Sequence, residues 1–192
     1  MAEISDQKSA ARKVAFAARK LAHRVGGAAA AVAARDRFLA ADIAQGAGVI
    51  AGYRPIRTEI DPTPLMDVLH GAGARLCVPV IRGEGQPLSF TEWWPGVALE
   101  PGPFGAEVPV GTPYLVPDLL IAPLVAFDRG CWRLGYGGGF YDRSLVEIRA
   151  TKPARAVGFA YGAQELDRIP REATDQRLDG VVTEAEVILP DG

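Results

Sequence analysis

A glycine cluster between charged residues is the stretch of this sequence best able to do chemistry. The glycines are Gly135 and Gly137–Gly139, with Arg133 before them and Asp142 after them. An apolar run precedes the cluster and the amphipathic run 145–148 follows it, so the predicted order is strand, glycine loop, helix. In that order backbone N–H groups and a helix N-terminus converge on an anion. Because the arginine adds positive charge and the aspartate could hold a metal ion, a phosphate-bearing ligand is our first hypothesis.

Two common nucleotide motifs do not fit this cluster. It is not a P-loop, because no Lys-Ser or Lys-Thr pair follows the glycines. It is not the dinucleotide fingerprint, because the third required glycine, counted from Gly135, falls on Phe140. A bare glycine cluster is more often a tight turn than a ligand cradle, so from these residues alone both interpretations stay open.

The elements that must position these residues follow an alternating pattern. Predicted strands alternate with predicted helices, which favours an α/β fold: a three-layer, mainly parallel open sheet with helices on both faces. Ligands of such sheets bind off the carboxyl ends of the strands, where Arg54, Glu59, the glycine loop and Asp175 all fall. The predicted helices are 5–25, 28–44, 61–70 and a run around 145–148, and the predicted strands are 47–53, 75–81, 88–93, 119–125, 155–161, 181–183 and 187–189.

The first predicted helix carries two different stripes. An apolar stripe, predicted to face the core, consists of Val14, Leu21 and Val25. A basic stripe consists of Lys8, Arg12 and Arg19, because offsets of four and seven residues return to nearly the same direction. From the residues alone, a solvated basic face is the ordinary interpretation of the second stripe, and an anion-binding face is the alternative.

The segment 95–117 is rich in glycine and proline and shows little periodicity. It is long for a structureless loop, so a lid or a substrate-lining segment is plausible. Nearby, Trp93, Trp94 and Phe104 could line an aromatic pocket, with core packing as the alternative for each.

Composition predicts one ordinary soluble domain spanning 1–192. The chain has 48% apolar and 23% charged residues and a formal charge of −2, which gives no global basic field for nucleic acid. No window reaches the eighteen apolar residues of a membrane span. Cys77 and Cys131 have no metal-ligand spacing, so we expect free thiols in a reducing compartment. The expected location is the cytoplasm.

Four segments together resemble the 5-formyltetrahydrofolate cyclo-ligase family, also called methenyltetrahydrofolate synthetase. The main one is R-L-G-Y-G-G-G-F-Y-D, with P-L-V-A-F-D before it. The others are K-S-A-A-R near the N-terminus, Y-R-P-I-R-T-E after the first predicted strand, and I-P-R-E-A-T-D near the C-terminus. The last has Thr174 where the family usually has histidine, and Phe140 replaces a usual tyrosine. The resemblance runs from Lys8 to about Thr183.

The resemblance implies a site for ATP, magnesium and a reduced folate. It implies Arg12, Arg133 and Tyr136 as catalytic residues, and Asp142 and Asp175 as Mg²⁺ ligands. It implies folate contacts from Arg54, Glu59, Tyr136, Gly137, Gly138, Gly139 and Phe140. It implies ATP contacts from Lys8, Ser9, Ala10, Ala11, Arg12, Arg133, Leu134, Gly135, Tyr136, Gly137, Gly138, Gly139, Phe140 and Tyr141.

The implied reaction converts 5-formyltetrahydrofolate and ATP to 5,10-methenyltetrahydrofolate, ADP and phosphate through phosphorylation of the formyl oxygen. The expected partner is this small molecule, with no nucleic acid and no membrane, and the expected state is a monomer. One alternative is a family member that binds folate and nucleotide as a carrier or regulator without catalysis. A second is a sugar-phosphate or acyl-CoA enzyme on a related scaffold, for which no nucleophile or base constellation is visible.

Overall fold

The structure, a computed structural model, describes residues 2–190, apart from the side chains of residues 2 and 104. Its main feature is an eight-stranded sheet in the order β12-β11-β10-β7-β1-β2-β3-β6. The five strands from β11 to β2 are parallel, and β12, β3 and β6 join antiparallel at the edges. In that order the strands are Val187–Ile188, Gly180–Val182, Arg155–Phe159, Leu119–Ala122, Val49–Ala51, Arg75–Ile81, Leu88–Trp93 and Tyr114–Leu115. The predicted mainly parallel sheet is confirmed.

Three α-helices and two small antiparallel pairs complete the described chain. The helices are α1 (Ala2–Ala40), α2 (Thr63–Gly71) and α3 (Phe140–Thr151), and two short 3₁₀ turns are η1 (Pro103–Gly105) and η2 (Gly162–Gln164). The pairs are β4 (Leu99–Pro101) with β5 (Glu107–Pro109), and β8 (Ala126–Phe127) with β9 (Arg133–Leu134). No helix among the described residues is long and apolar enough to cross a membrane.

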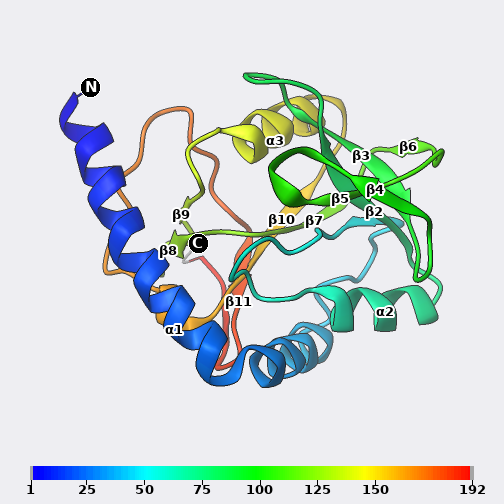
Figure 1. Ribbon diagram of the computed structural model, residues 1–192, viewed down its shortest axis with the longest axis horizontal. Helices are drawn as coiled ribbons and strands as arrows, with labels where there is room; N and C mark the ends of the chain where they lie inside the picture. The colour runs from blue at the N-terminus through cyan, green and yellow to red at the C-terminus, as the bar shows by residue number, and fades with distance from the viewer. Residues whose placement is uncertain (1, 191–192) are drawn as a thin grey trace.

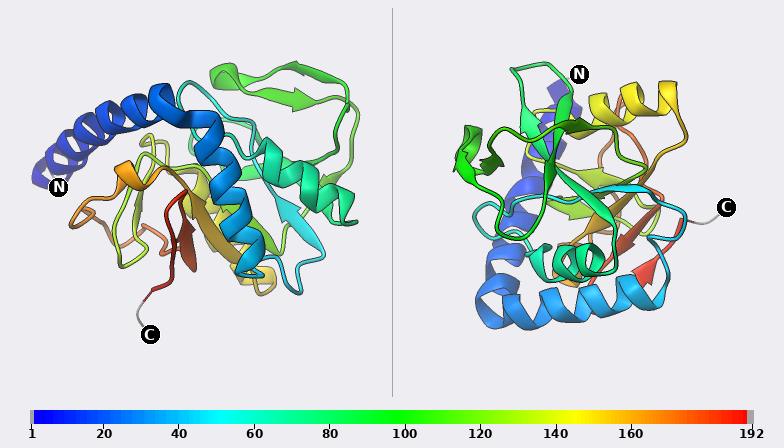
Figure 2. Two further views of the ribbon diagram at one scale, coloured as in Figure 1. Left: turned by 90° about the horizontal axis from the view of Figure 1, so that it is seen from below. Right: turned by 90° about the vertical axis from the view of Figure 1, so that its right-hand side faces the viewer.

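The predicted three layers are present, with α3 on one face of the sheet and α2 with the second half of α1 on the other (Figures 1 and 2). Alternating residues of β7 show why the sheet is covered twice. Leu119 packs with the α1–α2 cluster, whereas its neighbour Leu120 packs with Leu145 of α3. Because successive side chains point to opposite faces, a run of apolar residues requires cover on both.

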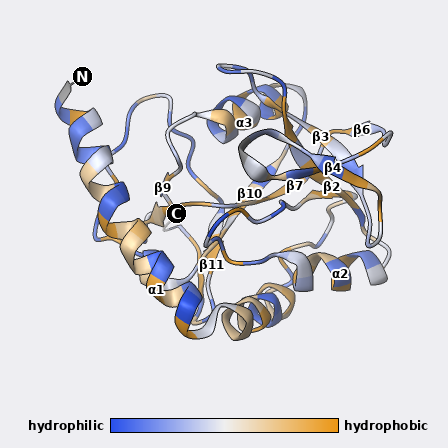
Figure 3. Cartoon of the chain, viewed as in Figure 1, coloured by the Kyte–Doolittle hydropathy of each residue, from blue (hydrophilic) through white to orange (hydrophobic). Residues whose placement is uncertain are grey.

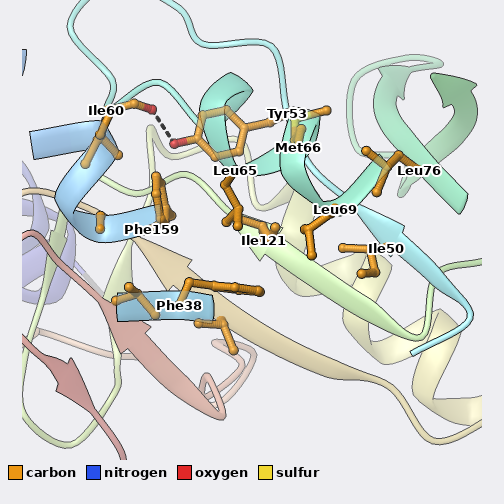
Figure 4. Packing of buried hydrophobic residues seen from close by; sticks show 14 of the residues in the cluster. Phe38, Ile50, Tyr53, Ile60, Leu65, Met66, Leu69, Leu76, Ile121 and Phe159 are labelled. Carbon is orange, nitrogen blue, oxygen red and sulfur yellow. Dashed lines mark hydrogen bonds between the residues drawn. The ribbon is translucent and has the colours of Figure 1, made fainter. Parts of the chain in front are cut away.

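The core cluster between the sheet and helices α1 and α2 also anchors a loop that reaches the large cleft described below. Phe38 from α1 and Leu65 from α2 pack here against strand residues such as Ile121 (Figure 4). The buried Tyr53, just after β1, donates a hydrogen bond from its hydroxyl to the carbonyl of Ile60 at 2.6 Å. That bond closes the base of loop 54–59, so the packed core fixes where this loop begins and ends.

Helix α1 differs from its prediction in two ways. The two predicted helices are one helix with a kink at Gly26, where the backbone leaves helical geometry. The predicted core-facing stripe is wrong: Val14, Leu21 and Val25 are 61%, 52% and 78% exposed, and Figure 3 shows mixed hydropathy along the helix.

The basic side of α1 faces the protein instead. Lys8 and Arg19 are 8% and 1% exposed, and Ala15 between them is buried against Val125 and Leu134. The small alanine brings the helix backbone close, and the long cations extend past it to polar partners. The solvated interpretation of the basic stripe is therefore wrong.

The glycine- and proline-rich segment 95–117 is more ordered than its composition suggests. It contains the β4–β5 hairpin, η1 and edge strand β6. Pro103, Ala106 and Val108 of this segment line the large cleft described below. Cys77 and Cys131 are both buried, as predicted, and burial raises the pKa of the Cys77 thiol to about 12.

Close packing after β1 gives a stability prediction. A Cβ at the buried Gly52 would collide with Met66 of α2, lying 2.8 Å from its Cε atom. We expect Gly52→Ala to lower the free energy of unfolding by about 1–3 kcal/mol, the usual cost of overpacking a core. Urea denaturation measures this, with Gly71→Ala at the end of α2 as the control because its Cβ meets nothing within 4 Å. Equal midpoints for the two variants would contradict the packing.

The connections around β1 and β7 create a topological switch point. These strands are neighbours, yet the helix after β1 (α2) covers one face and the helix after β7 (α3) covers the other. The segments that leave β1 and β7 therefore diverge beyond the carboxyl ends of these strands and leave a crevice between them. Ligands of open α/β sheets bind in such a crevice.

Candidate active site

A large cleft lies at this switch point. Its volume is about 1320 Å³, and α1, loop 54–59, the glycine loop, α3 and segment 172–176 all contribute to its wall. Every residue predicted for the site lines it except Ser9, Ala10 and Ala11. Those lining residues are Lys8, Arg12, Arg54, Glu59, Arg133, Leu134, Gly135, Tyr136, Gly137, Gly138, Gly139, Phe140, Tyr141, Asp142 and Asp175.

Helical spacing explains the three exceptions. Ser5, Lys8 and Arg12 lie three and four residues apart, so they share the side of α1 that faces the cleft. Ser9 and Ala10 are exposed, and Ala11 packs on the small cluster around Ala15. Of the five α1 residues predicted to contact ATP, Lys8 to Arg12, only Lys8 and Arg12 are therefore expected to do so through their side chains.

Arg12 brings α1 into contact with the glycine loop. Its Nε donates to the carbonyl of Gly135 at 2.8 Å, and its guanidinium lies beside Gly137, where an added Cβ would be 3.4 Å from Nη2. Arg12 and Gly135 are 123 residues apart in the sequence. The predicted meeting of the cationic helix and the glycine loop is thus present in the fold.

The glycine loop has a backbone that requires glycine. Gly137 and Gly139 have φ values of +108° and +64°, which most side chains avoid. Gly139 caps the N-terminus of α3, which begins at Phe140 in the cleft wall. The first amides of a helix have no intrahelical partner and attract negative charge. The ligand-cradle interpretation therefore has the geometry it needs.

Lys8 is held by two carboxylates. Its Nζ lies 2.8 Å from Glu172 Oε2 and 2.7 Å from Asp175 Oδ2. Burial lowers the pKa of Lys8, but the hydrogen bonds to the two carboxylates outweigh it and the pKa is raised. The ammonium is therefore charged at neutral pH and faces the cleft with its counter-ions beside it.

Arg133 has a comparable arrangement. Its side chain is 4% exposed; Nη2 lies 3.0 Å from Asp142 Oδ1, and Nη1 donates to the carbonyl of Gln176 at 2.8 Å. The N–H of Gln176 in turn donates to Asp142 Oδ1 at 2.8 Å. Arg133 thus fixes Asp142 and segment 172–176 against each other, so the two predicted metal ligands belong to one connected unit.

The chemistry of this unit fits Mg²⁺. Asp142 Oδ2 and Asp175 Oδ1 accept no hydrogen bond from any described residue. No group of three acidic, histidine or cysteine side chains in the described chain is close enough to hold a metal alone. Mg²⁺ commonly takes one or two carboxylates and completes its shell with phosphate oxygens and water. Two free carboxylate oxygens in the cleft wall that the glycine loop also lines meet that requirement.

The cleft is also lined by a buried carboxylate. Glu59 is 5% exposed and accepts the N–H of Ile56 at 2.9 Å through Oε2. Burial raises its pKa, against the lowering effects of the Ile56 N–H, Arg19, the Tyr136 hydroxyl and Arg57. Arg54 is paired with Glu107 of β5 at 3.2 Å, which ties loop 54–59 to the β4–β5 hairpin.

Tyr141 presents an unusual polar group. Its hydroxyl is buried and has no hydrogen-bond partner among the described residues, although the side chain lines the cleft. Burial, followed by the charge of Glu59, raises its pKa, so the hydroxyl stays protonated as a donor. An unpaired buried hydroxyl is costly, and a ligand in the cleft would give this one a partner.

The predicted aromatic pocket is not formed by tryptophans. Trp93 is 4% exposed in the larger core cluster, and neither it nor Trp94 lines the cleft. The side chain of Phe104 lies outside the described residues. Tyr53, Tyr136, Phe140 and Tyr141 supply the aromatic lining instead.

Sequence reasoning missed several residues of the site. Glu172 lies in the quoted I-P-R-E-A-T-D segment but was given no role, and Arg57 lines the cleft with an unusual φ of +56°. A positive φ in a residue other than glycine is common at functional sites, but no sequence signal predicts it. Arg19 was noticed only as part of the basic stripe.

These features define an α/β protein with a cleft lined by cations, glycines and carboxylates at its switch point. The family model described as the 5-formyltetrahydrofolate cyclo-ligase family matches residues 4–184. The 5-formyltetrahydrofolate cyclo-ligase of Escherichia coli K12 is 35% identical over 147 residues, which cover 73% of this chain and 80% of the relative. The Mycolicibacterium smegmatis relative of the same name is 33% identical, covering 70% and 72%.

Solved structures agree with these relatives. The 5,10-methenyltetrahydrofolate synthetase of Aquifex aeolicus has a TM-score of 0.78 and 30% identity, covering 96% of this chain and 94% of that one. The synthetase of Mycoplasma pneumoniae, at 22% identity and a TM-score of 0.74, shares the fold. This chain belongs to the 5-formyltetrahydrofolate cyclo-ligase family, as its sequence motifs predicted.

Proposed function

We propose that this chain cyclises 5-formyltetrahydrofolate to 5,10-methenyltetrahydrofolate, using ATP with Mg²⁺ and releasing ADP and phosphate. The observation that carries the proposal is the contact of Arg12 with Gly135, which brings cations and helix amides to one end of the cleft that Glu59 lines. We further propose that the chain forms a single domain and acts as a monomer. We also propose a cytoplasmic location, with no nucleic-acid or membrane partner.

The triphosphate would lie between α1 and the glycine loop. Arg12 can offer a planar fork of donors and Lys8 a point charge, both suited to phosphate oxygens. The amides of the glycine loop and the N-terminus of α3 add a fixed positive field. Phosphoryl transfer needs this positioning and charge neutralisation more than covalent chemistry from the protein.

Asp142 and Asp175 would hold Mg²⁺ through their free oxygens. When bound there, the ion would neutralise phosphate charge and orient the transferred group. Asp175 now holds Lys8 at 2.7 Å, so we propose that Lys8 shifts toward the incoming phosphates while Glu172 stays as its near counter-ion at 2.8 Å. The cleft would then exchange one set of ion pairs for another without exposing an unpaired charge.

The pterin would occupy the other end of the cleft. Its amino and ring N–H donors form a paired edge, and the Glu59 carboxylate is a matching acceptor. The aromatic lining from Tyr136, Phe140 and Tyr141 suits a flat ring. Phe140 lacks a hydroxyl, so its part is limited to packing.

The proposed chemistry activates a poor leaving group. The formyl oxygen attacks the γ-phosphorus; an O–P bond forms and the bond to ADP breaks. The carbon is then an iminium phosphate, and the 10-nitrogen attacks it to form the new C–N bond. The C–O bond breaks, phosphate leaves with the former formyl oxygen, and the nitrogen loses its proton.

The unpartnered Tyr141 hydroxyl gives a prediction for this site. We expect Tyr141→Phe to leave the free energy of unfolding unchanged or up to about 1 kcal/mol higher, because it removes an unsatisfied buried group. We expect the KM for 5-formyltetrahydrofolate to rise about three- to tenfold, the scale of one lost hydrogen bond. Thermal unfolding and steady-state kinetics measure the two effects. A lower stability with unchanged KM would assign the hydroxyl to the fold.

One assay separates a catalyst from a carrier. The protein is mixed with 5-formyltetrahydrofolate, ATP and Mg²⁺, while absorbance follows the methenyl product and ADP and phosphate are counted. We expect one ADP and one phosphate for each methenyl group over many turnovers. A carrier would bind both ligands with no product, and that outcome would overturn the proposed function.

A further inference from the structure

Arg19 is a buried cation with no role in the mechanism above. It is 1% exposed on α1 and makes no ion pair with any described carboxylate. Burying a charge is expensive unless hydrogen bonds and nearby charges compensate. A solvent-excluded arginine in a helix that is otherwise amphipathic therefore has a specific purpose in this fold.

Its guanidinium joins three segments that surround the folate end of the cleft. Nε donates to Thr58 Oγ1 at 3.2 Å, in loop 54–59. Nη1 donates to the carbonyl of Leu124 at 3.4 Å, just beyond β7. Nη2 donates to the hydroxyl of Tyr136 at 2.6 Å, in the glycine loop.

Tyr136 and Glu59 both line the cleft. The Tyr136 oxygen accepts from Arg19, and the tyrosine hydroxyl favours the ionised form of Glu59. The tyrosine ring is also restrained, with the Phe16 ring centroid at 5.4 Å and the guanidinium carbons of Arg19 and Arg57 at 5.3 and 5.8 Å from its own centroid. Arg19 thus links loop 54–59, through Thr58 next to Glu59, to the glycine loop, through Tyr136.

Arg19 and Tyr136 are among the groups that act on the charge of Glu59. Arg19, Arg57, the Tyr136 hydroxyl and the Ile56 N–H favour the ionised form, whereas burial opposes it. Tyr53 and Tyr141 are neutral, and the carboxylate raises the pKa of each.

We propose that Arg19 is a positioning residue for the substrate: through Thr58 and Tyr136 it holds loop 54–59 against the glycine loop, so that the Glu59 carboxylate faces the N–H donors of the pterin. The inference rests on the proposed function and adds a residue to it. Arg19 itself would touch neither folate nor ATP. Its loss would therefore affect folate binding and its pH dependence much more than ATP binding.

The test compares Arg19→Met with Arg24→Met, a matched change at an exposed arginine on the same helix. Binding of 5-formyltetrahydrofolate without ATP, and of ATP without folate, is measured by calorimetry over a range of pH. For Arg19→Met we expect the folate dissociation constant to rise about tenfold or more while that for ATP stays within about twofold. Losing the arginine raises the pKa of Glu59. The acid limb of folate binding, which is the pH range in which binding weakens on acidification, should therefore move up by about one pH unit or more.

Further variants distinguish positioning from general structure. Arg19→Lys keeps the charge without the fork, so it should return the acid limb toward the wild-type pH more fully than it restores affinity. If Arg19→Met does not fold, Tyr136→Phe removes only the bridging hydroxyl and should produce the same pair of effects.

Two outcomes would overturn the inference while leaving the proposed function intact: equal loss of folate and ATP binding, or an acid limb that does not move. Wild-type protein that neither binds folate nor forms the methenyl product would contradict the proposed function, and the inference with it.

Discussion

Replacing Arg12 with alanine is expected to lower kcat/KM for ATP by about 10²–10³-fold, the range seen when one preorganised electrostatic donor is removed from an active site. Arg12 lies directly on the glycine loop, with Nε bonded to Gly135 and the guanidinium beside Gly137. Because the hydrogen bond of Arg12 within the described chain goes to one carbonyl, the free energy of unfolding should fall by no more than about 1 kcal/mol. Steady-state kinetics with ATP varied, together with thermal unfolding, measures both quantities.

The matched control for this change is Lys13→Ala, which removes a neighbouring positive charge that is exposed and outside the cleft. It should retain nearly full activity. Arg12→Lys should fall between the two because it keeps the charge and loses the fork. If Arg12→Ala and Lys13→Ala had the same kinetics, α1 would have no part in holding the triphosphate.

Replacing Asp142 with asparagine is expected to raise the Mg²⁺ concentration for half-maximal activity by at least about 10- to 100-fold, the cost reported even for outer partners of metal ligands. An asparagine Oδ1 can still accept from Arg133 and Gln176, as the aspartate does at 3.0 and 2.8 Å, so the local geometry should persist. Asp142→Asn therefore removes the negative charge of the side chain and keeps its shape. A magnesium titration of turnover at saturating ATP measures it.

Asp67→Asn provides the control, since Asp67 is exposed on α2 and does not line the cleft. Its magnesium titration should match that of the wild type. The same midpoint for Asp142→Asn would remove Asp142 from the proposed metal site. Arg133→Ala is a less direct test of phosphate binding, because it would also leave Asp142 without its buried partner.

The sheet was largely predictable from the sequence. The strands at 75–81 and 88–93 were placed correctly because short apolar or alternating runs lie between glycine and proline turns. The run of buried residues in β7 correctly indicated cover on both faces. The strand order was not predicted, because it depends on pairings between distant segments such as β1 with β7.

The orientation of α1 was mispredicted for a physical reason. Hydrophobic periodicity assumes that a helix buries its apolar stripe, but the first half of α1 forms a wall of the cleft. Its inward side instead carries Lys8, whose partners lie 164 and 167 residues away in the chain. Nothing local in the sequence reports such partners. Because this basic side of α1 faces the protein, Val14 and Leu21 on another side of the helix are exposed.

Family motifs predicted more of the residues that line the cleft than composition and hydrophobic periodicity did. Resemblance to the family identified Lys8, Arg12, Glu59, the glycine loop and Asp175, and the fold brings all of them to one cleft. Arg19 was not recognised, because its value depends on three contacts made only in the folded protein. Glu172 was missed because its relation to Lys8 likewise exists only in three dimensions.

The central claim is that ATP on the glycine loop and the folate beside Glu59 react within a single cleft. The most direct measurement starts with 5-formyltetrahydrofolate carrying ¹⁸O in its formyl group and follows that label by mass spectrometry after one turnover in unlabelled water. Direct phosphorylation of the formyl oxygen predicts that the label leaves in the released phosphate, one ¹⁸O per methenyl group formed. Phosphate without ¹⁸O would show that ATP and the formyl group never exchange an atom, and it would contradict the account.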